Sequence, residues 1–240
     1  MECSEHIFAR GAALLQQRQF AEAEQQARRG LVNHPDDGRL WQVSGVACWA
    51  MSQFGRARQA LETASCLRPL FPLARIALAE CYVRFGLTES ARYIYEFLAE
   101  GDHCPVGLLA KVAAGLGRIG DDQRALQVCR KLARLEPKHH AAFFGMAYYM
   151  ARLGYPLRGC LRRLGQAHRL APETLHYRVN LAFACAGQEQ FRKAANLLRE
   201  VAPEAVACAC WVRGMVRIFE KAGEDELVRR FAERLEELER

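Results

Sequence analysis

The segments VRFGLTESA (83–91), GRIGDDQRA (117–125) and ARLGYPLRG (151–159) begin 34 residues apart and share one pattern. Each contains an arginine, an apolar residue and a glycine in a row, and a small residue follows five positions after the glycine. A fixed interval of this length is the signature of a repeat protein, in which each repeat forms one unit of structure. We therefore follow the interval outward from these segments in both directions.

Prolines and small residues keep the same interval along most of the chain. The prolines are Pro35, Pro69, Pro137 and Pro172. One set of small residues is Gly11, Gly45, Ala79, Ala113, Ala147 and Ala182, and a second set is Ala23, Ala57, Ala91, Ala125, Gly159 and Ala194. Two helices approach each other closely only where no large side chain lies between them. The two sets therefore predict two packed helices in every repeat.

These features resemble the tetratricopeptide repeat (TPR) family, whose unit is a pair of antiparallel helices with a small residue in each and a proline after the second. Trp41 and the aromatic residues Phe20, Phe54 and Phe191 fit the same pattern. The resemblance implies an all-α fold, a right-handed α-solenoid of about seven helix-turn-helix units. We expect residues 1–240 to form a single domain, with units near 4–37, 38–71, 72–105, 106–139, 140–174, 175–208 and 209–240. The last unit is degenerate and is expected to cap the array.

Gly115, Gly117 and Gly120 also spell G-x-G-x-x-G, the pattern of a dinucleotide-binding loop. That loop follows a strand, whereas residues 106–113, VGLLAKVA, show no strand alternation and contain good helix formers. In the repeat, Gly120 falls between two helices, where a left-handed glycine commonly ends a helix. Asp121 and Asp122 are placed to cap the next helix. The repeat thus explains the glycines, and we predict no cofactor.

The composition favours anionic partners. Lys and Arg number 34 against 27 Asp and Glu, a net charge of +7, which leaves acidic protein, nucleic acid and membrane headgroups open. No apolar run approaches the ~18–20 residues of a membrane span, and the amino terminus lacks the pattern of a signal peptide. We expect a cytoplasmic protein whose ten cysteines are reduced.

No residue pattern in the sequence predicts catalysis or metal binding. Ser44 directly precedes the packing residue Gly45, which indicates a structural role. Cys208 and Cys210 are too closely spaced for a zinc-binding pair and have no matching second pair nearby. No two carboxylates are spaced for general acid–base chemistry on one helix face. We therefore predict a non-enzymatic protein.

The TPR resemblance implies that the first helices of the units line a concave groove, which holds a peptide of a partner protein. The helical period, counted from the small residues, predicts which side chains face this groove. They are Phe8, Trp49, Lys111, Phe144, Tyr148, Asn180 and Phe183. One turn further along the first helices lie Arg84, Arg118 and Arg152, a column that would attract acidic groups. We expect a scaffold, adaptor or chaperone that binds a peptide segment.

Three alternatives remain open at this point. WQVSGVACWAMSQFGRA (41–57) and ALAECYVRFGLTESA (77–91) resemble chaperones of bacterial type III secretion, which shield extended segments of translocator proteins. RNA binding is a second possibility for a basic helical-repeat protein, although the groove positions lack the matching polar readers that an RNA code needs in every unit. Self-association through the apolar ends of the array is the third.

Overall fold

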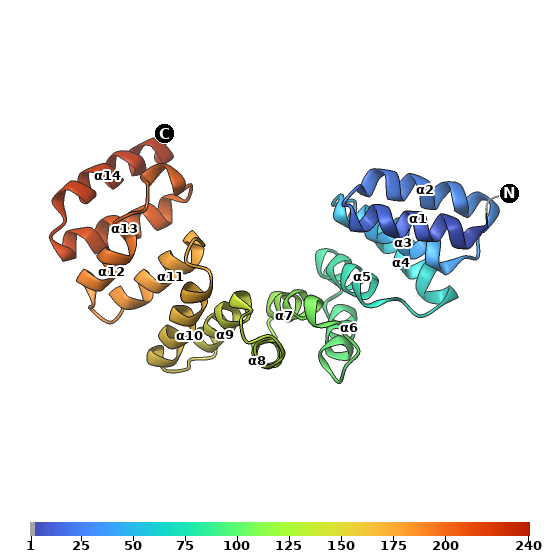
Figure 1. Ribbon diagram of the computed structural model, residues 1–240, viewed down its shortest axis with the longest axis horizontal. Helices are drawn as coiled ribbons and strands as arrows, with labels where there is room; N and C mark the ends of the chain where they lie inside the picture. The colour runs from blue at the N-terminus through green and yellow to red at the C-terminus, as the bar shows by residue number, and fades with distance from the viewer. Residues whose placement is uncertain (1–2) are drawn as a thin grey trace. The chain divides into compact units, whose positions relative to one another are not determined.

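The computed structural model describes residues 3–240, and this part of the chain contains fourteen α-helices, two short 3-10 helices and no strand (Figure 1). The first helices of the successive pairs are α1 (Ser4–Gln16), α3 (Gly38–Ala50), α5 (Pro72–Arg84), α7 (Leu109–Arg118), α9 (His140–Arg152), α11 (Leu175–Ala186) and α13 (Ala209–Ala222). The second helices are α2 (Phe20–Asn33), α4 (Phe54–Leu67), α6 (Thr88–Ala99), α8 (Asp122–Leu135), α10 (Leu157–Leu170), α12 (Phe191–Leu198) and α14 (Asp225–Glu239). The all-α fold and the seven helix pairs agree with the sequence-based prediction.

The chain divides into two compact units, Met1–Val128 and Cys129–Arg240, with the boundary inside α8. In the first unit, α1, α3, α5 and α7 contact one another in order, while α2, α4 and α6 each pack between successive first helices. In the second unit, α9 packs on α10, α11 on both α10 and α12, and α13 on both α12 and α14. The single domain expected over residues 1–240 stays a prediction.

A left-handed residue follows the first helix of every pair. Gly120 has φ of +82°, and the Asp121 backbone N–H donates to the Leu116 carbonyl at 2.9 Å, which closes the helix end. The Asp121 side chain accepts a hydrogen bond from the Arg124 backbone N–H at 3.0 Å and so caps α8. The same positive φ occurs at the equivalent residues Arg18, Ser52, Gly86, Gly154, Glu189 and Gly223. The G-x-G-x-x-G pattern thus ends in a helix stop and a turn, as predicted.

The small residues lie where neighbouring helices meet. All the alanines of both sets are buried, and Gly45 faces Leu61 so closely that a Cβ atom at this position would lie 2.5 Å from Leu61 Cγ. Gly159, which replaces alanine in the fifth unit, is half-buried. Because neighbouring side chains use the space left by these residues, the interval of 34 residues is enforced by packing.

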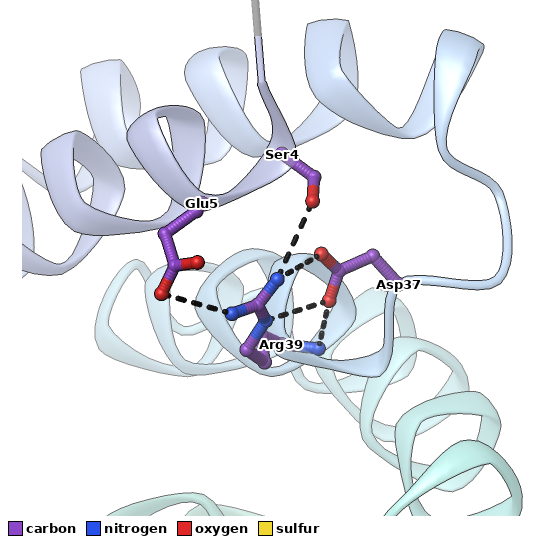
Figure 2. Close-up of polar contacts among 4 residues, drawn as sticks. All are labelled: Ser4, Glu5, Asp37 and Arg39. Atoms are coloured by element: carbon purple, nitrogen blue, oxygen red, sulfur yellow. Dashed lines mark hydrogen bonds and ion pairs between the residues drawn. The ribbon is translucent and has the colours of Figure 1, made fainter.

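Arg39 at the start of α3 ties the first two repeats together (Figure 2). Its guanidinium donates to Asp37 Oδ2 at 3.0 Å and to Ser4 Oγ at 3.3 Å, and lies 3.6 Å from Glu5 Oε1. The Asp37 side chain also accepts a hydrogen bond from the Arg39 backbone N–H at 2.9 Å, so it caps α3. One arginine therefore joins the beginnings of two first helices.

Two repeats depart from the regular pattern. Before the fourth pair, a 3-10 helix, η1 (Val106–Leu108), precedes α7, in the region where the repeat's proline is displaced to Pro105. In the last pair, Phe231 of α14 is fully buried against Phe219 of α13, with ring centroids 5.2 Å apart. A second 3-10 helix, η2 (Pro203–Ala205), packs against α14. Helix α14 therefore covers an apolar side of α13, while a capping role for this last pair stays a prediction.

Candidate functional site

A hollow of about 480 Å³ opens over the first helices of the first unit. Its apolar lining comes from Leu15 of α1, Val46 and Trp49 of α3, and Leu73 of α5. Phe20 and Phe54, the first residues of α2 and α4, also line it, and Arg18, Glu80 of α5 and Lys111 of α7 supply charged groups. The register of the repeat therefore brings apolar and charged side chains from four first helices to one place.

Glu80 is the polar centre of this hollow. Trp49 Nε1 donates to Glu80 Oε2 at 3.0 Å, and Arg118 donates to Glu80 Oε1 at 2.6 Å. Burial lowers the pKa of Arg118, but the neighbouring Glu80 carboxylate outweighs this effect and leaves that pKa above its usual value. Arg118 is therefore cationic at neutral pH, and the two hydrogen bonds to Glu80 together fix the orientation of the Trp49 indole.

Lys111 presents a positive charge at the same hollow. Its Nζ lies 5.6 Å from the centre of the Trp49 ring, a cation–π geometry. No carboxylate within residues 3–240 forms an ion pair with Lys111, whose side chain is exposed. An anionic group placed in the hollow would therefore meet a cation next to an apolar wall.

The predicted arginine column is held by contacts within the protein. Arg84 lies over the Phe54 ring at 4.8 Å, and Arg118 is paired with Glu80. Arg152 lies over the Tyr148 ring at 5.7 Å and donates to its hydroxyl at 3.3 Å. These contacts orient the three guanidinium groups, which remain exposed.

In the second unit, aromatic residues connect successive first helices. Phe144 of α9 stacks on Tyr177 of α11 at 5.0 Å, and His176 of α11 lies 5.4 Å from Trp211 of α13. Phe183 of α11 lies against Gly214 of α13, where a Cβ atom would be 2.8 Å from its ring. Part of each aromatic surface is therefore used for packing between repeats.

A second hollow, of about 390 Å³, lies beside Phe183. Phe191 and Ile218 give it apolar walls, and Arg217, Glu220 and Lys221 supply charged groups. Both hollows thus combine aromatic or aliphatic walls with basic side chains.

Comparisons with known proteins address the fold. No protein-family model and no curated protein matches the chain. Among solved structures, a TPR protein from Parabacteroides merdae matches with a TM-score of 0.67 at 15% identity, over 98% of this chain and 93% of that one. PilF of Pseudomonas aeruginosa matches with a TM-score of 0.70 at 14% identity, over 84% of this chain and 91% of that one.

YrrB, described as a TPR protein with an unusual peptide-binding site, matches with a TM-score of 0.59 at 14% identity. The match covers 71% of this chain and 88% of YrrB. The chain has the TPR fold. At these identities the likeness shows the fold, and it leaves the ligand of this protein to be argued from its own side chains.

The structure places three of the predicted groove residues in the two hollows. Trp49 and Lys111 line the first hollow, and Phe183 lines the second. Phe8 is half-buried under the guanidinium of Arg39 at 5.4 Å. Asn180 donates to the His176 carbonyl of its own helix at 2.7 Å. The assignment of these residues, and of Phe144, Tyr148 and the three arginines, to a ligand site stays a prediction.

Sequence reasoning missed other residues of the first hollow, namely Leu15, Arg18, Phe20, Val46, Ala50, Ser52, Phe54, Leu73 and Glu80. The usable signal was the spacing of Glu80 and Arg118, which stand 38 residues apart, one repeat plus about one helical turn. Opposite charges at that separation on first helices come close when the repeats stack.

The net charge of the TPR array is confined to its second unit. Residues 1–128 contain 14 Lys and Arg and 14 Asp and Glu, so their charges cancel. Residues 129–240 contain 20 Lys and Arg and 13 Asp and Glu, which gives a net charge of +7. Arg158, Arg162, Arg169 and Lys193 of this unit line a further hollow of about 520 Å³ that no carboxylate lines. Any attraction of anions by net charge therefore acts through residues 129–240.

Two further features bear on function. Within residues 3–240, no helix is both long and apolar enough to cross a membrane. In the same part of the chain, no three His, Cys, Asp or Glu side chains are grouped so that they could hold a metal ion.

Proposed function

We propose that this TPR protein is a non-enzymatic interaction protein that binds a peptide segment of a partner on its first helices. The observation that carries the proposal is the hollow in which Leu15, Trp49 and Leu73 form an apolar wall beside Lys111, a cation with no ion-pair partner within residues 3–240. Apolar walls with a few placed polar groups are typical of ligand sites. The described peptide-binding site of YrrB, which shares the fold, supports the same kind of ligand.

The side chains of the hollow define the peptide that fits. An aliphatic or aromatic side chain would bury its surface against Trp49 and Leu73, and this contributes about 1.5–3 kcal/mol before ordering costs. A neighbouring carboxylate would pair with Lys111, for about 0.2–1 kcal/mol at an exposed site. Glu80 is engaged by Trp49 and Arg118 and would repel a second carboxylate placed beside it. The preferred segment is therefore an apolar residue flanked on the Lys111 side by an acidic one.

Selection of random peptides displayed on phage, with the folded chain as bait, tests the proposal. Enriched peptides should share the apolar–acidic pattern and bind the chain in fluorescence anisotropy. Trp49→Ala should weaken binding about tenfold to a hundredfold, and Lys111→Ala up to about fivefold. Tyr93→Ala is the matched control, because Tyr93 is an exposed aromatic residue on the second helix α6. Equal affinity for the Trp49→Ala and Tyr93→Ala variants would refute the site.

RNA binding is the second candidate, and the basic second unit favours it. A mixed-sequence RNA should then bind with an affinity that falls steeply with salt, because released counterions drive such binding. Charge reversal at Arg158 and Arg162 should abolish this binding and leave peptide binding at Trp49 unchanged. Binding weaker than about 10 µM with no salt dependence would exclude RNA. Shielding of a type III secretion substrate and self-association remain narrower forms of the protein-binding proposal.

A further inference from the structure

Two cysteine side chains face each other at the entrance to α13. The Sγ atoms of Cys208 and Cys210 lie 2.7 Å apart, and both residues are exposed. Cys208 is the N-cap residue of α13, with an extended backbone (φ −108°, ψ 113°), whereas Cys210 is the second residue of the helix. This change of backbone direction turns two side chains at i and i+2 toward each other.

The other cysteines are arranged differently. Cys48, Cys81, Cys104, Cys129, Cys160 and Cys185 are buried. Burial raises the pKa of Cys81 and of Cys129 to about 12, which keeps both thiols protonated and unreactive. Cys3 and Cys66 are exposed, but neither has a second cysteine beside it in the described structure. Cys208 and Cys210 are thus the exposed thiols that are already paired.

The surroundings of Cys208 favour its thiolate. When Cys208 is ionised, the Cys210 thiol donates a hydrogen bond to its sulfur, and this bond together with backbone N–H groups at the start of α13 lowers the pKa of Cys208. The same hydrogen bond, which is lost when Cys210 ionises, raises the pKa of Cys210. One sulfur is therefore the nucleophile, and the other holds the proton until the second step.

The backbone around the pair is anchored on both sides. Val206 is buried, and its carbonyl accepts from the Arg234 guanidinium of α14 at 3.4 Å. On the other side, the Trp211 ring lies 5.4 Å from that of His176 in α11. The two sulfurs are thus held near each other, and they need to approach by less than about 1 Å to reach the length of a disulfide bond.

We propose that Cys208 and Cys210 form a reversible dithiol–disulfide couple that is oxidised by low-molecular-weight disulfides. The Cys208 thiolate attacks one sulfur of the small disulfide, forms a mixed disulfide and releases one small thiolate. Cys210 then gives up its proton and attacks Cys208 Sγ, which forms the intramolecular disulfide and releases the second small thiolate. Two electrons pass from the protein to the small disulfide, which leaves as two thiols, and excess small thiol reverses both steps.

The test uses the full-length chain and oxidised glutathione. The reduced, folded chain should take up N-ethylmaleimide at four exposed thiols, which are Cys3, Cys66, Cys208 and Cys210. After treatment with oxidised glutathione, tryptic peptide 200–213, which contains both cysteines, should have lost two hydrogen atoms and should not react with N-ethylmaleimide. Reduced glutathione in excess should restore its reaction. A peptide that carries glutathione on both cysteines, or stays fully reduced, would overturn the proposal.

Matched variants separate the two roles of Cys210. In Cys210→Ser the hydroxyl can still donate to Cys208, but no second attack is possible, so Cys208 should stop at the glutathione mixed disulfide. In Cys210→Ala the donor is absent, and alkylation of Cys208 near pH 7 should slow by at least about threefold relative to Cys210→Ser. Cys66→Ser should change neither result. Equal alkylation rates in the Ser and Ala variants would contradict the assigned roles of the two sulfurs.

Discussion

The ring of Tyr95 in α6 occupies the space beside Gly115 in α7, where a Cβ atom would lie 2.2 Å from Tyr95 Cζ. Tyr95 is fully buried and cannot move aside. Gly115→Ala should therefore lower the free energy of unfolding by about 1–3 kcal/mol, although alanine is the better helix former. Urea denaturation followed by circular dichroism measures the change.

Gly165→Ala is the control for this prediction. Gly165 lies inside α10, and an added Cβ there would meet only the tip of Arg169, at 3.7 Å. This variant should gain about 0.5–1 kcal/mol from helix propensity. If both variants shift the unfolding midpoint in the same direction, the close approach of Tyr95 and Gly115 does not limit stability.

Replacement of the non-glycine residues at the left-handed turns should stabilise the protein. Ser52 has φ of +60°, a conformation in which a Cβ atom is strained. Ser52→Gly should raise the free energy of unfolding by about 0.5–1 kcal/mol, because relief of strain exceeds the added chain entropy. Ser90→Gly, within helix α6, should instead lower it by up to about 1 kcal/mol. Thermal unfolding of the two variants should therefore shift in opposite directions.

Asp37 and Asp121 should make stability depend on pH in acid. Burial alone would raise the pKa of Asp37, but hydrogen bonds from Arg39 outweigh it and the net pKa is lowered; Asp121 behaves likewise with Arg124. A carboxylate with a lowered folded pKa stabilises the fold at pH above its unfolded value of about 3.9. This contribution is lost as the pH falls through the folded pKa.

The free energy of unfolding should accordingly fall more steeply below about pH 4 in the wild type than in an Asp37→Asn, Asp121→Asn variant. Asparagine keeps the capping oxygen and removes only the titration. Asp36→Asn is the control, because Asp36 is exposed and has no hydrogen-bond or ion-pair partner in the described chain. Parallel pH profiles for the wild type and the double variant would contradict the assignment.

Substitutions at Glu80 separate its hydrogen bond with Trp49 from its ion pair with Arg118 in the first hollow. Glu80→Gln keeps an acceptor for Trp49 Nε1 and loses only the charge pairing with Arg118, so it should cost at most about 1 kcal/mol. Glu80→Ala leaves the indole N–H without its partner and should cost about 1–3 kcal/mol. Trp49→Phe removes the indole N–H, so in that background Glu80→Gln and Glu80→Ala should lower the free energy of unfolding by nearly the same amount. A double-mutant cycle measures this coupling. Additive effects would show that the indole does not depend on Glu80.

Much of the fold could be predicted from the sequence, because close packing requires particular residues at fixed intervals. Ala57 and Ala91 were predicted to lie where neighbouring helices meet, and both are fully buried. Gly86 and Gly120 have the left-handed backbone expected at the turn. Arg18, Ser52 and Glu189 adopt the same turn without glycine. The residue types at these three positions do not indicate a left-handed backbone, because the packing of the repeat imposes a strained conformation on an ordinary residue.

The candidate site was predictable only in part. Helical register placed Trp49 and Phe183 on first helices, and both line hollows. Register does not tell which partner a long side chain reaches, and the arginine column illustrates this. Arg84 lies on Phe54 and Arg118 binds Glu80, contacts that depend on rotamers and on the offset between repeats. The sulfur pair at residues 208 and 210 likewise depends on the backbone at the start of α13.

The left-handed turns have a consequence for protein engineering. Gly86, Gly120 and Gly154 have φ values of +73°, +82° and +75°, and each turn is closed by hydrogen bonds to its own preceding helix. Any two of these glycines are therefore equivalent splice points, at which the chain enters and leaves with the same local geometry. Removing or duplicating the 34 residues between two neighbouring glycines would rejoin one turn to its copy, so the length of the protein can be edited in whole modules without designing a new loop.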